Sequence, residues 1–345
     1  MTRVVLDLED RRPVWAMPRW AVDELAAALP EGWELHVSTS PADGSGDGGG
    51  APSAEVLAAV RGARVYIGFG IPEAVLDAGG ETLEWVHSGA AGVGSSLYGA
   101  MLSSRAHFTN SAGIHGPPIA ETVVAMVLHF VRGLDLALAA QVRGEWDDTP
   151  FLEADTPVRE LSALTVGILG YGGIGREVGA RMAPLARRVI GLRRSRPEKP
   201  VDSHGVRLLS GAKGLRRLFA ESDVLVIAVP DTPKTRNFID RARIRSLPRG
   251  ALLVNVARGK IVESGALLDA LRDGHLRGAA LDVFPTEPLP PNDPLWTLPN
   301  VLITPHVSAV THGFWRRQVD LILGNLGRFC EGRPLRNEVN RAEGY

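Results

Sequence analysis

The chain has 345 residues, of which 45% are hydrophobic and 22% are charged, and its formal net charge at pH 7 is −1. This length is sufficient for two domains with separate cores, and the near-zero charge argues against a polyanionic partner such as nucleic acid. The single cysteine, Cys330, excludes an internal disulfide and a cysteine-based zinc site. We therefore expect a reducing compartment and no bound metal.

Two features argue against a secreted or membrane protein. The first ten residues contain four charged side chains, so they do not form the apolar region of a secretory signal. The most apolar long stretch, 119–140, is interrupted by Glu121, His129, Arg132 and Asp135. A membrane span needs about 20 nearly uninterrupted apolar residues. The sequence therefore predicts a cytoplasmic protein with no membrane association.

Short β-rich runs alternate with helical spacing over the first hundred residues. We expect a helix at 21–29, ending at Pro30, and strands at 3–8, 33–38, 63–69 and 83–88. Such alternation favours βα units on a parallel sheet. The segment 41–53 is rich in Gly, Ser and Asp and has little to bury. It predicts a mobile surface loop.

A long helix is predicted to begin at Pro117-Pro118, because proline is tolerated in a first turn, and to reach at least Gly133. The β-runs that follow Leu164 are almost entirely apolar, as strands covered on both faces must be. Strands are expected at 165–170, 187–193, 224–229, 251–257, 278–283 and 301–305, with helices at 212–220, 264–274 and after about Ala309. The pattern predicts an α/β protein with two doubly wound parallel-sheet domains.

The stretch GYGGIG, 170–175, follows an expected strand and opens an expected helix. Gly170 permits a tight turn, Gly172 lets the backbone approach a pyrophosphate, and Gly175 lets the helix pack on the strand. Gly173 and Ile174 belong to the helix N-terminus, whose N–H groups favour phosphate. The motif therefore predicts a dinucleotide site, the alternative being a purely structural turn.

The residues that follow this motif bear on the choice of nucleotide. A carboxylate usually stands about 20 residues past such a turn, where it binds the ribose hydroxyls. Here Arg193 and Arg194 stand there, 18 and 19 residues after Gly175. Guanidinium groups offer a bidentate fork to a 2′-phosphate. NADP is therefore favoured and NAD remains possible, unless the pair is only a solvated strand end.

A second group of residues follows later strands. Arg258, Asp282 and His306 each come after an expected strand, and Glu287 lies in a proline-rich loop. Ligands bind beyond the carboxyl ends of strands in open α/β sheets, so these side chains should converge. An imidazolium that donates a proton, a carboxylate that orients it and an arginine that binds substrate suit hydride transfer to a carbonyl. Taken singly, each has an ordinary structural alternative.

Four segments resemble the D-isomer-specific 2-hydroxyacid dehydrogenases: TVGILGYGGIG, VNVARGKIV, GAALDVFPTEPLP and NVLITPHVSA. The resemblance covers most of the chain and is densest from about 160 to 310. It implies that Arg258, Glu287 and His306 form the catalytic triad and that Asp282 contacts the nicotinamide amide. Further implied cofactor contacts are Val229, Pro230, Thr235, Val256, Ala257 and Ser308.

The same resemblance implies a Rossmann nucleotide-binding domain, 113–309, inserted into a flavodoxin-like substrate domain, 1–112 and 310–345, with the active site in the cleft. Residues 87–94, HSGAAGVG, resemble the segment whose backbone binds the substrate carboxylate, which assigns this role to Ala91, Gly92 and Val93. The family commonly has Gly-Ala-Gly-Val-Asp here. Peptide N–H groups come from any residue, so carboxylate binding is expected to persist.

Residues 111–128 resemble the family's hinge and dimerisation helix, which implies a homodimer through the helix that begins at Pro117. His115 lies beside the expected cleft, and its role stays open.

The leading hypothesis is an NADP-preferring reductase that converts small 2-oxo acids, such as glyoxylate or hydroxypyruvate, to D-2-hydroxy acids. A phosphoglycerate dehydrogenase is less favoured because the chain ends soon after the catalytic segment. A formate dehydrogenase needs no proton-donating His–Glu pair. The alternative from another class is a dinucleotide-sensing, corepressor-like binding protein. The physiological substrate and the direction of the reaction stay open.

Overall fold

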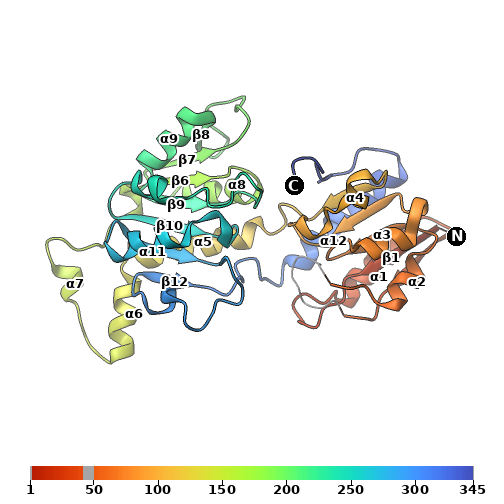
Figure 1. Ribbon diagram of the computed structural model, residues 1–345, viewed down its shortest axis with the longest axis horizontal. Coiled ribbons are helices and arrows are strands. Elements are labelled where there is room, and N and C mark those ends of the chain that lie inside the picture. Colours follow the sequence, from red (N-terminus) through yellow and green to blue (C-terminus); the bar gives the residue numbers. More distant parts are fainter. Residues whose placement is uncertain (1, 42–49, 345) are drawn as a thin grey trace. The chain divides into compact units, whose positions relative to one another are not determined.

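The computed structural model describes residues 2–41 and 50–344, so most of the loop predicted at 41–53 lies outside the described residues. Two compact units make up the chain, Met1–His115 with Val310–Tyr345, and Gly116–Ala309. We call them unit 1 and unit 2 and describe each by itself (Figure 1). The sequence analysis placed the first boundary three residues earlier, between 112 and 113.

Unit 1 contains a five-stranded parallel sheet in the order β2-β1-β3-β4-β5. The strands are β1 (Thr2–Asp7), β2 (Trp33–Val37), β3 (Ala63–Gly68), β4 (Trp85–Ser88) and β5 (His107–Asn110). This order is that of flavodoxin-like sheets. Strand β5 was not predicted, because its four residues HFTN contain a single large apolar side chain.

Helices cover both faces of this sheet. On one face lie α1 (Arg19–Ala27) and α12 (Phe314–Cys330), and on the other α2 (Ala54–Val60), α3 (Glu73–Gly79) and α4 (Gly99–Ser103). Successive side chains of β1 point to opposite faces of the sheet. Val4 and Leu6 therefore pack in the core beneath α12, and Val5 packs in the core on the opposite face. The C-terminal helix is therefore part of the N-terminal unit.

Unit 2 contains a seven-stranded parallel sheet in the order β12-β11-β10-β9-β6-β7-β8. The strands are β6 (Thr165–Leu169), β7 (Arg188–Leu192), β8 (Arg207–Leu209), β9 (Val224–Ile227), β10 (Ala251–Asn255), β11 (Leu276–Leu281) and β12 (Val301–Ile303). Strand order reverses between β6 and β9, which is where Rossmann sheets bind dinucleotides. The three-residue edge strand β8 was not predicted.

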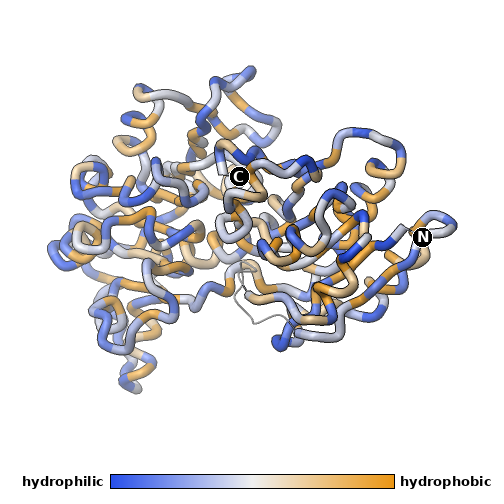
Figure 2. The backbone as a smooth tube through the Cα atoms, turned by 45° about the vertical axis from the view of Figure 1, so that its right-hand side comes forward, coloured by the Kyte–Doolittle hydropathy of each residue, from blue (hydrophilic) through white to orange (hydrophobic). Residues whose placement is uncertain are grey.

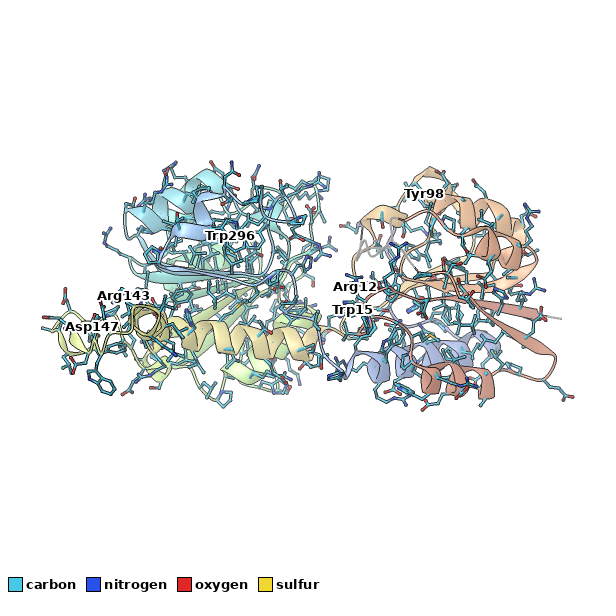
Figure 3. The ribbon with its side chains drawn as sticks, turned by 90° about the horizontal axis from the view of Figure 1, so that it is seen from below. Arg12, Trp15, Tyr98, Arg143, Asp147 and Trp296 are labelled. Carbon is cyan, nitrogen blue, oxygen red and sulfur yellow. The ribbon has the colours of Figure 1, made fainter. Side chains whose placement is uncertain are left out.

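Two helical layers sandwich this sheet. One contains α5 (Gly116–Val131) and α8 (Gly173–Met182), and the other α9 (Gly211–Glu221), α10 (Arg241–Arg245) and α11 (Ser264–Arg272). Figure 3 shows α5 below the sheet and α11 above it. Hydrophobic segments accordingly gather inside the unit and hydrophilic ones at its periphery (Figure 2). The all-apolar strands predicted from the sequence are thus buried on both faces.

Two helices of unit 2, α6 (Leu134–Arg143) and α7 (Thr149–Leu152), lie beyond the sheet (Figure 1). Within the described ranges no single helix is long and apolar enough to cross a membrane. The pair α5 and α6 reaches that length and composition together, but the two helices are bent by 71°. Short 3-10 helices occur at Gly80–Thr82, Gly94–Ser96, Leu161–Ala163, Gly259–Ile261 and Pro294–Thr297.

Candidate active site

The glycine-rich turn lies directly after β6, and two of its glycines, Gly170 and Gly175, are sterically required. Gly170 has a φ of +99°, and a Cβ there would overlap the carbonyl of Ala228. A Cβ on Gly175 would overlap the carbonyl of Gly170, so only glycine lets α8 start this close to β6. A Cβ on Gly172 would meet nothing within 4 Å. The backbone at Gly172 therefore borders open space, as an approaching pyrophosphate requires.

The beginning of α8 supplies unpaired donors at the same place. Gly172 makes no side-chain cap. Among the described residues, no acceptor takes the N–H groups of Gly173, Ile174 or Gly175. Free N–H groups at a helix N-terminus bind phosphate oxygens. The turn thus fits the pyrophosphate of a dinucleotide by its shape and by its donors.

Arg193 and Arg194 directly follow the last residue of β7. The N–H of Arg193 donates to the carbonyl of Leu209 on the edge strand β8 (3.0 Å), and Nη2 donates to Ser195 Oγ (3.0 Å). Arg193 is half-buried and Arg194 is exposed. Both residues are therefore at the strand end where a ribose-binding carboxylate usually stands.

The segment after β9 contains Val229, Pro230 and Thr235. Val229 lies against the glycine turn, since a Cβ on Gly170 would be 2.8 Å from one of its methyl carbons. Thr235 Oγ1 donates to the carbonyl of Pro230 (2.7 Å) and closes the turn. Asp231 pairs with Arg236 (3.0 Å). The segment thus borders the proposed nucleotide site.

A buried asparagine shapes the loop that carries Arg258. Asn255 ends β10, and its side chain accepts from the N–H of Ala257 (3.1 Å) and donates to the carbonyl of Arg258 (3.1 Å). Val256 and Ala257 are buried, whereas Arg258 is half-buried and its Nη1 donates to the carbonyl of Ala257 (2.8 Å). The sequence analysis missed Asn255, although a polar residue ending an all-apolar strand was a usable signal.

Gly259 brings the Arg258 loop against the loop after β11. A Cβ on Gly259 would overlap the carbonyl group of Phe284 and the nitrogen of Pro285. This contact places Arg258 next to the segment that contains Glu287.

We predict that Gly259→Ala lowers kcat/KM by at least about 10²-fold. The added methyl group would push the Arg258 loop away from the loop that contains Glu287. Displacing catalytic groups by about 1 Å lowers the rate by a factor of about that size. Gly265→Ala is the matched control, since its Cβ would meet nothing within 4 Å. Steady-state kinetics test this, and equal activity of both variants would contradict it.

Asp282 organises the loop that carries His306. Its carboxylate is fully buried and accepts from Thr304 Oγ1 (2.6 Å), the N–H of Val307 (2.9 Å), and both the N–H and the hydroxyl of Ser308. Its carbonyl accepts from the N–H of His306 (2.9 Å). Asp282, expected at the nicotinamide amide, therefore holds the 304–308 loop in the described structure.

His306 and Glu287 form a hydrogen-bonded pair. His306 Nδ1 lies 2.7 Å from Glu287 Oε2, and Glu287 Oε1 accepts from the N–H of Phe284 (2.8 Å). A carboxylate only accepts, so Nδ1 carries hydrogen. Nε2 has no partner in the described part of the chain, and the side chain is 44% exposed. The imidazole is thus oriented with its second nitrogen available to a ligand.

The backbone at His306 is strained. Its φ is +55°, which non-glycine residues rarely adopt. Hydrogen bonds from its N–H to Asp282 and Thr304 maintain this conformation. Such strain persists only where the surroundings impose it, and it is concentrated at functional sites.

The predicted substrate loop belongs to unit 1 and follows β4. Ala91 and Gly92 are half-buried and Val93 is buried. Their three N–H groups have no acceptor among residues 2–41 and 50–344. Consecutive free N–H groups form a cradle for an anion. The loop is therefore suited to a carboxylate.

Comparisons with known proteins identify the family that the chain resembles. The profile of the D-isomer specific 2-hydroxyacid dehydrogenase family, NAD binding domain, matches residues 124–308. D-3-phosphoglycerate dehydrogenase of Methanocaldococcus jannaschii is 35% identical over 222 residues, 64% of this chain and 41% of that protein. The chain thus matches less than half the length of that relative.

Two solved structures are similar over the whole chain. A D-isomer specific 2-hydroxyacid dehydrogenase from Xanthobacter autotrophicus Py2, in complex with NADPH and MES, has a TM-score of 0.79 at 29% identity, covering 100% of this chain and 99% of that one. An NADPH-dependent glyoxylate/hydroxypyruvate reductase from Sinorhizobium meliloti, in complex with NADP and sulfate, has a TM-score of 0.77 at 27% identity, covering 100% of both chains.

The fold and site thus define a two-unit α/β protein with a dinucleotide-binding sheet and a His–Glu pair at the strand ends. The chain belongs to the D-isomer specific 2-hydroxyacid dehydrogenase family. The family's members are oxidoreductases, and the two-domain fold predicted from the sequence is confirmed.

Proposed function

We propose that this protein is an NADP-preferring reductase that converts small 2-oxo acids of the glyoxylate or hydroxypyruvate type to D-2-hydroxy acids in the cytoplasm. The observation that carries the proposal is the His306–Glu287 pair (2.7 Å), because Glu287 orients the ring and leaves Nε2 exposed, where the imidazolium form can donate a proton. The NADP and NADPH complexes of the two structural relatives support the cofactor class.

The cofactor would be held by four sets of residues at one edge of the unit 2 sheet. Gly170, Gly172, Gly173, Ile174 and Gly175 would bind the pyrophosphate, Val229, Pro230 and Thr235 would line the adenosine side, and Val256, Ala257, Asp282 and Ser308 the nicotinamide side. Arg193 and Arg194 would bind the 2′-phosphate. When bound, the reduced nicotinamide supplies the electron pair and hydrogen that reduce the carbonyl carbon.

The chain's own residues would bind and protonate the substrate. His306 Nε2 donates a proton to the carbonyl oxygen, while Glu287 accepts from Nδ1 and keeps the ring oriented. Arg258 presents a planar guanidinium for the substrate carboxylate or carbonyl. The N–H groups of Ala91, Gly92 and Val93 bind the carboxylate.

The direct test is NADPH oxidation with a panel of glyoxylate, hydroxypyruvate and 3-phosphohydroxypyruvate, followed by the loss of reduced-nicotinamide absorbance. We expect turnover of the first two and weaker turnover of the phosphorylated acid. Tight NADPH binding without turnover of any 2-oxo acid would favour the dinucleotide-sensing alternative. Preferred turnover of 3-phosphohydroxypyruvate would assign the phosphoglycerate dehydrogenase branch.

The proposed homodimer surface lies on residues 134–152, which follow the helix predicted to form it. Helix α5 buries Ile119, Val123, Val127 and Phe130 inside unit 2. The exposed apolar side chains come next in the chain: Leu134 (49%), Leu138 (50%), Val142 (88%), Trp146 (96%) and Leu152 (76%). Leu134, Leu138 and Val142 recur every fourth residue on α6 and so share one face of that helix. Exposed apolar faces are typical of protein interfaces.

We predict that Val142→Glu with Trp146→Glu converts a micromolar dimer to monomer, because buried unpaired carboxylates cost several kcal/mol. Light scattering measures the change. Leu185→Glu, at a 42% exposed apolar position elsewhere in unit 2, should leave the dimer intact. A monomeric wild type, or an unaffected double variant, would defeat this assignment.

A further inference from the structure

A buried chain of hydrogen bonds lies beneath the substrate loop of unit 1. It contains Trp85 and His87 of β4, Thr109 of β5, and Ser111, all with 0% exposure. His87 Nδ1 lies 2.8 Å from Thr109 Oγ1, and Nε2 lies 3.1 Å from Ser111 Oγ. None of these polar side chains has a place in the mechanism proposed above.

A group that can only donate at one end and a group that can only accept at the other set the direction of the bonds. Trp85 Nε1–H can only donate, and it donates to Thr109 Oγ1 (2.8 Å). The Thr109 hydroxyl hydrogen is then free to donate to His87 Nδ1. At the other end, Ser111 Oγ donates to the carbonyl of Ser88 (3.0 Å), so it must accept from His87 Nε2–H. The network therefore requires neutral His87 with its hydrogen on Nε2.

Burial maintains the neutral form. Complete desolvation lowers the pKa of His87 to about 3, so the ring is uncharged at neutral pH. An imidazolium would have hydrogen on both nitrogens, which would reverse the bond to Thr109.

Gln318 of α12 lies against the same ring nitrogen. Its amide nitrogen is 3.1 Å from His87 Nε2, and its amide oxygen is buried without a partner among the described residues. An amide nitrogen only donates, so it cannot accept from Nε2–H. Gln318 is therefore a neighbour of the network and does not set the direction of its bonds.

The last hydrogen bonds of this network reach the backbone of the substrate loop. Ser111 holds the carbonyl of Ser88 with its hydroxyl and that of Ala90 with its N–H (3.2 Å), and Asn110 Nδ2 holds the carbonyl of Ala91 (2.8 Å). The C=O and N–H of a trans peptide point in opposite directions. Anchoring the carbonyls of Ala90 and Ala91 on the β5 side therefore turns the N–H groups of Ala91 and Gly92 the other way.

We propose that His87 is a positioning residue, which acts through Ser111 to aim the N–H groups of Ala91 and Gly92 at the substrate carboxylate. The inference rests on the carboxylate-binding role proposed for this loop. Its consequence is that changes at His87 alter substrate KM rather than the proton donor or cofactor binding.

The kinetic test compares three variants with wild type. We expect His87→Leu and Ser111→Ala to raise the 2-oxo acid KM by about 10- to 100-fold, with kcat within about threefold and the NADPH KM unchanged. His87→Gln, which can donate and accept like neutral histidine, should restore KM to within about fivefold. Asn325→Leu removes an equally buried side chain of α12 that bonds only to Arg336, and it should leave KM unchanged.

A second readout needs no turnover. Nitrogen-15 spectra of histidine-labelled wild type should show His87 as the Nε2–H tautomer at neutral pH. Hydrogen exchange should accelerate in His87→Leu at Ser111, whose N–H donates to the carbonyl of Ala90. Unchanged KM and exchange in folded variants, or an Nδ1–H tautomer, would overturn the inference. If wild type reduces no 2-oxo acid, the proposed function fails, while tautomer and exchange still decide the positioning role.

Discussion

Replacing His306 by glutamine will lower kcat for 2-oxo acid reduction by at least about 10²-fold, while the Kd for NADPH changes by less than about threefold. Glutamine retains a hydrogen-bonding side chain but has no acidic proton to give. The effect is expected on kcat because His306 is the proposed proton donor to the reacting oxygen, whereas the glycine turn proposed to bind phosphate follows a different strand.

A variant of the partner separates orientation from proton donation. Glu287→Gln keeps a hydrogen-bond acceptor beside His306 Nδ1 but removes the carboxylate charge, so we expect a smaller loss, about 10-fold. Stopped-flow turnover measures kcat, and fluorescence titration measures the Kd for NADPH. Near-normal kcat in His306→Gln would show that this residue is not the proton donor and that its role is structural.

The variant Arg193→Asp with Arg194→Ala will reverse cofactor preference, changing the NADPH-to-NADH ratio of kcat/KM by at least about 10²-fold. A charge-assisted hydrogen bond contributes about 1.5–3 kcal/mol, so each lost arginine costs NADPH roughly 10- to 150-fold. The new carboxylate would bind ribose hydroxyls and repel a 2′-phosphate. The loss should appear mainly in KM, because the 2′-phosphate is remote from the reacting carbon.

Arg187→Ala is the matched control, since Arg187 precedes β7 at its opposite end and donates to Thr165 Oγ1 (3.0 Å). It should leave the cofactor ratio unchanged. The single variants Arg193→Ala and Arg194→Ala should lower kcat/KM for NADPH and leave kcat/KM for NADH unchanged. Equal losses for both cofactors would instead indicate stacking on adenine, and cofactor preference would then have another origin.

Local pattern was sufficient for most of the fold. The almost entirely apolar runs at 165–169, 224–227 and 251–255 are strands because both faces of the sheet are covered. Pro117 and Pro118 lie in the first turn of α5, as expected. Strands β5 and β8 escaped prediction because they are three or four residues long and depend on pairing with β4 and β7 rather than on their own composition.

The sequence by itself determined which chemical groups follow which strands: the glycine turn after β6, Arg258 after β10 and His306 after β12. Parallel strands bring their carboxyl ends to one edge, so order along the chain was enough to predict convergence. Only the tertiary structure decided how those groups are held. Three features join residues that are distant in sequence: the hydrogen bonds from Asp282 to the 304–308 loop, the contact of Gly259 with Phe284, and the hydrogen bonds of His87. Contacts of that kind depend on distances and angles across the fold, and local periodicity contains no information about them.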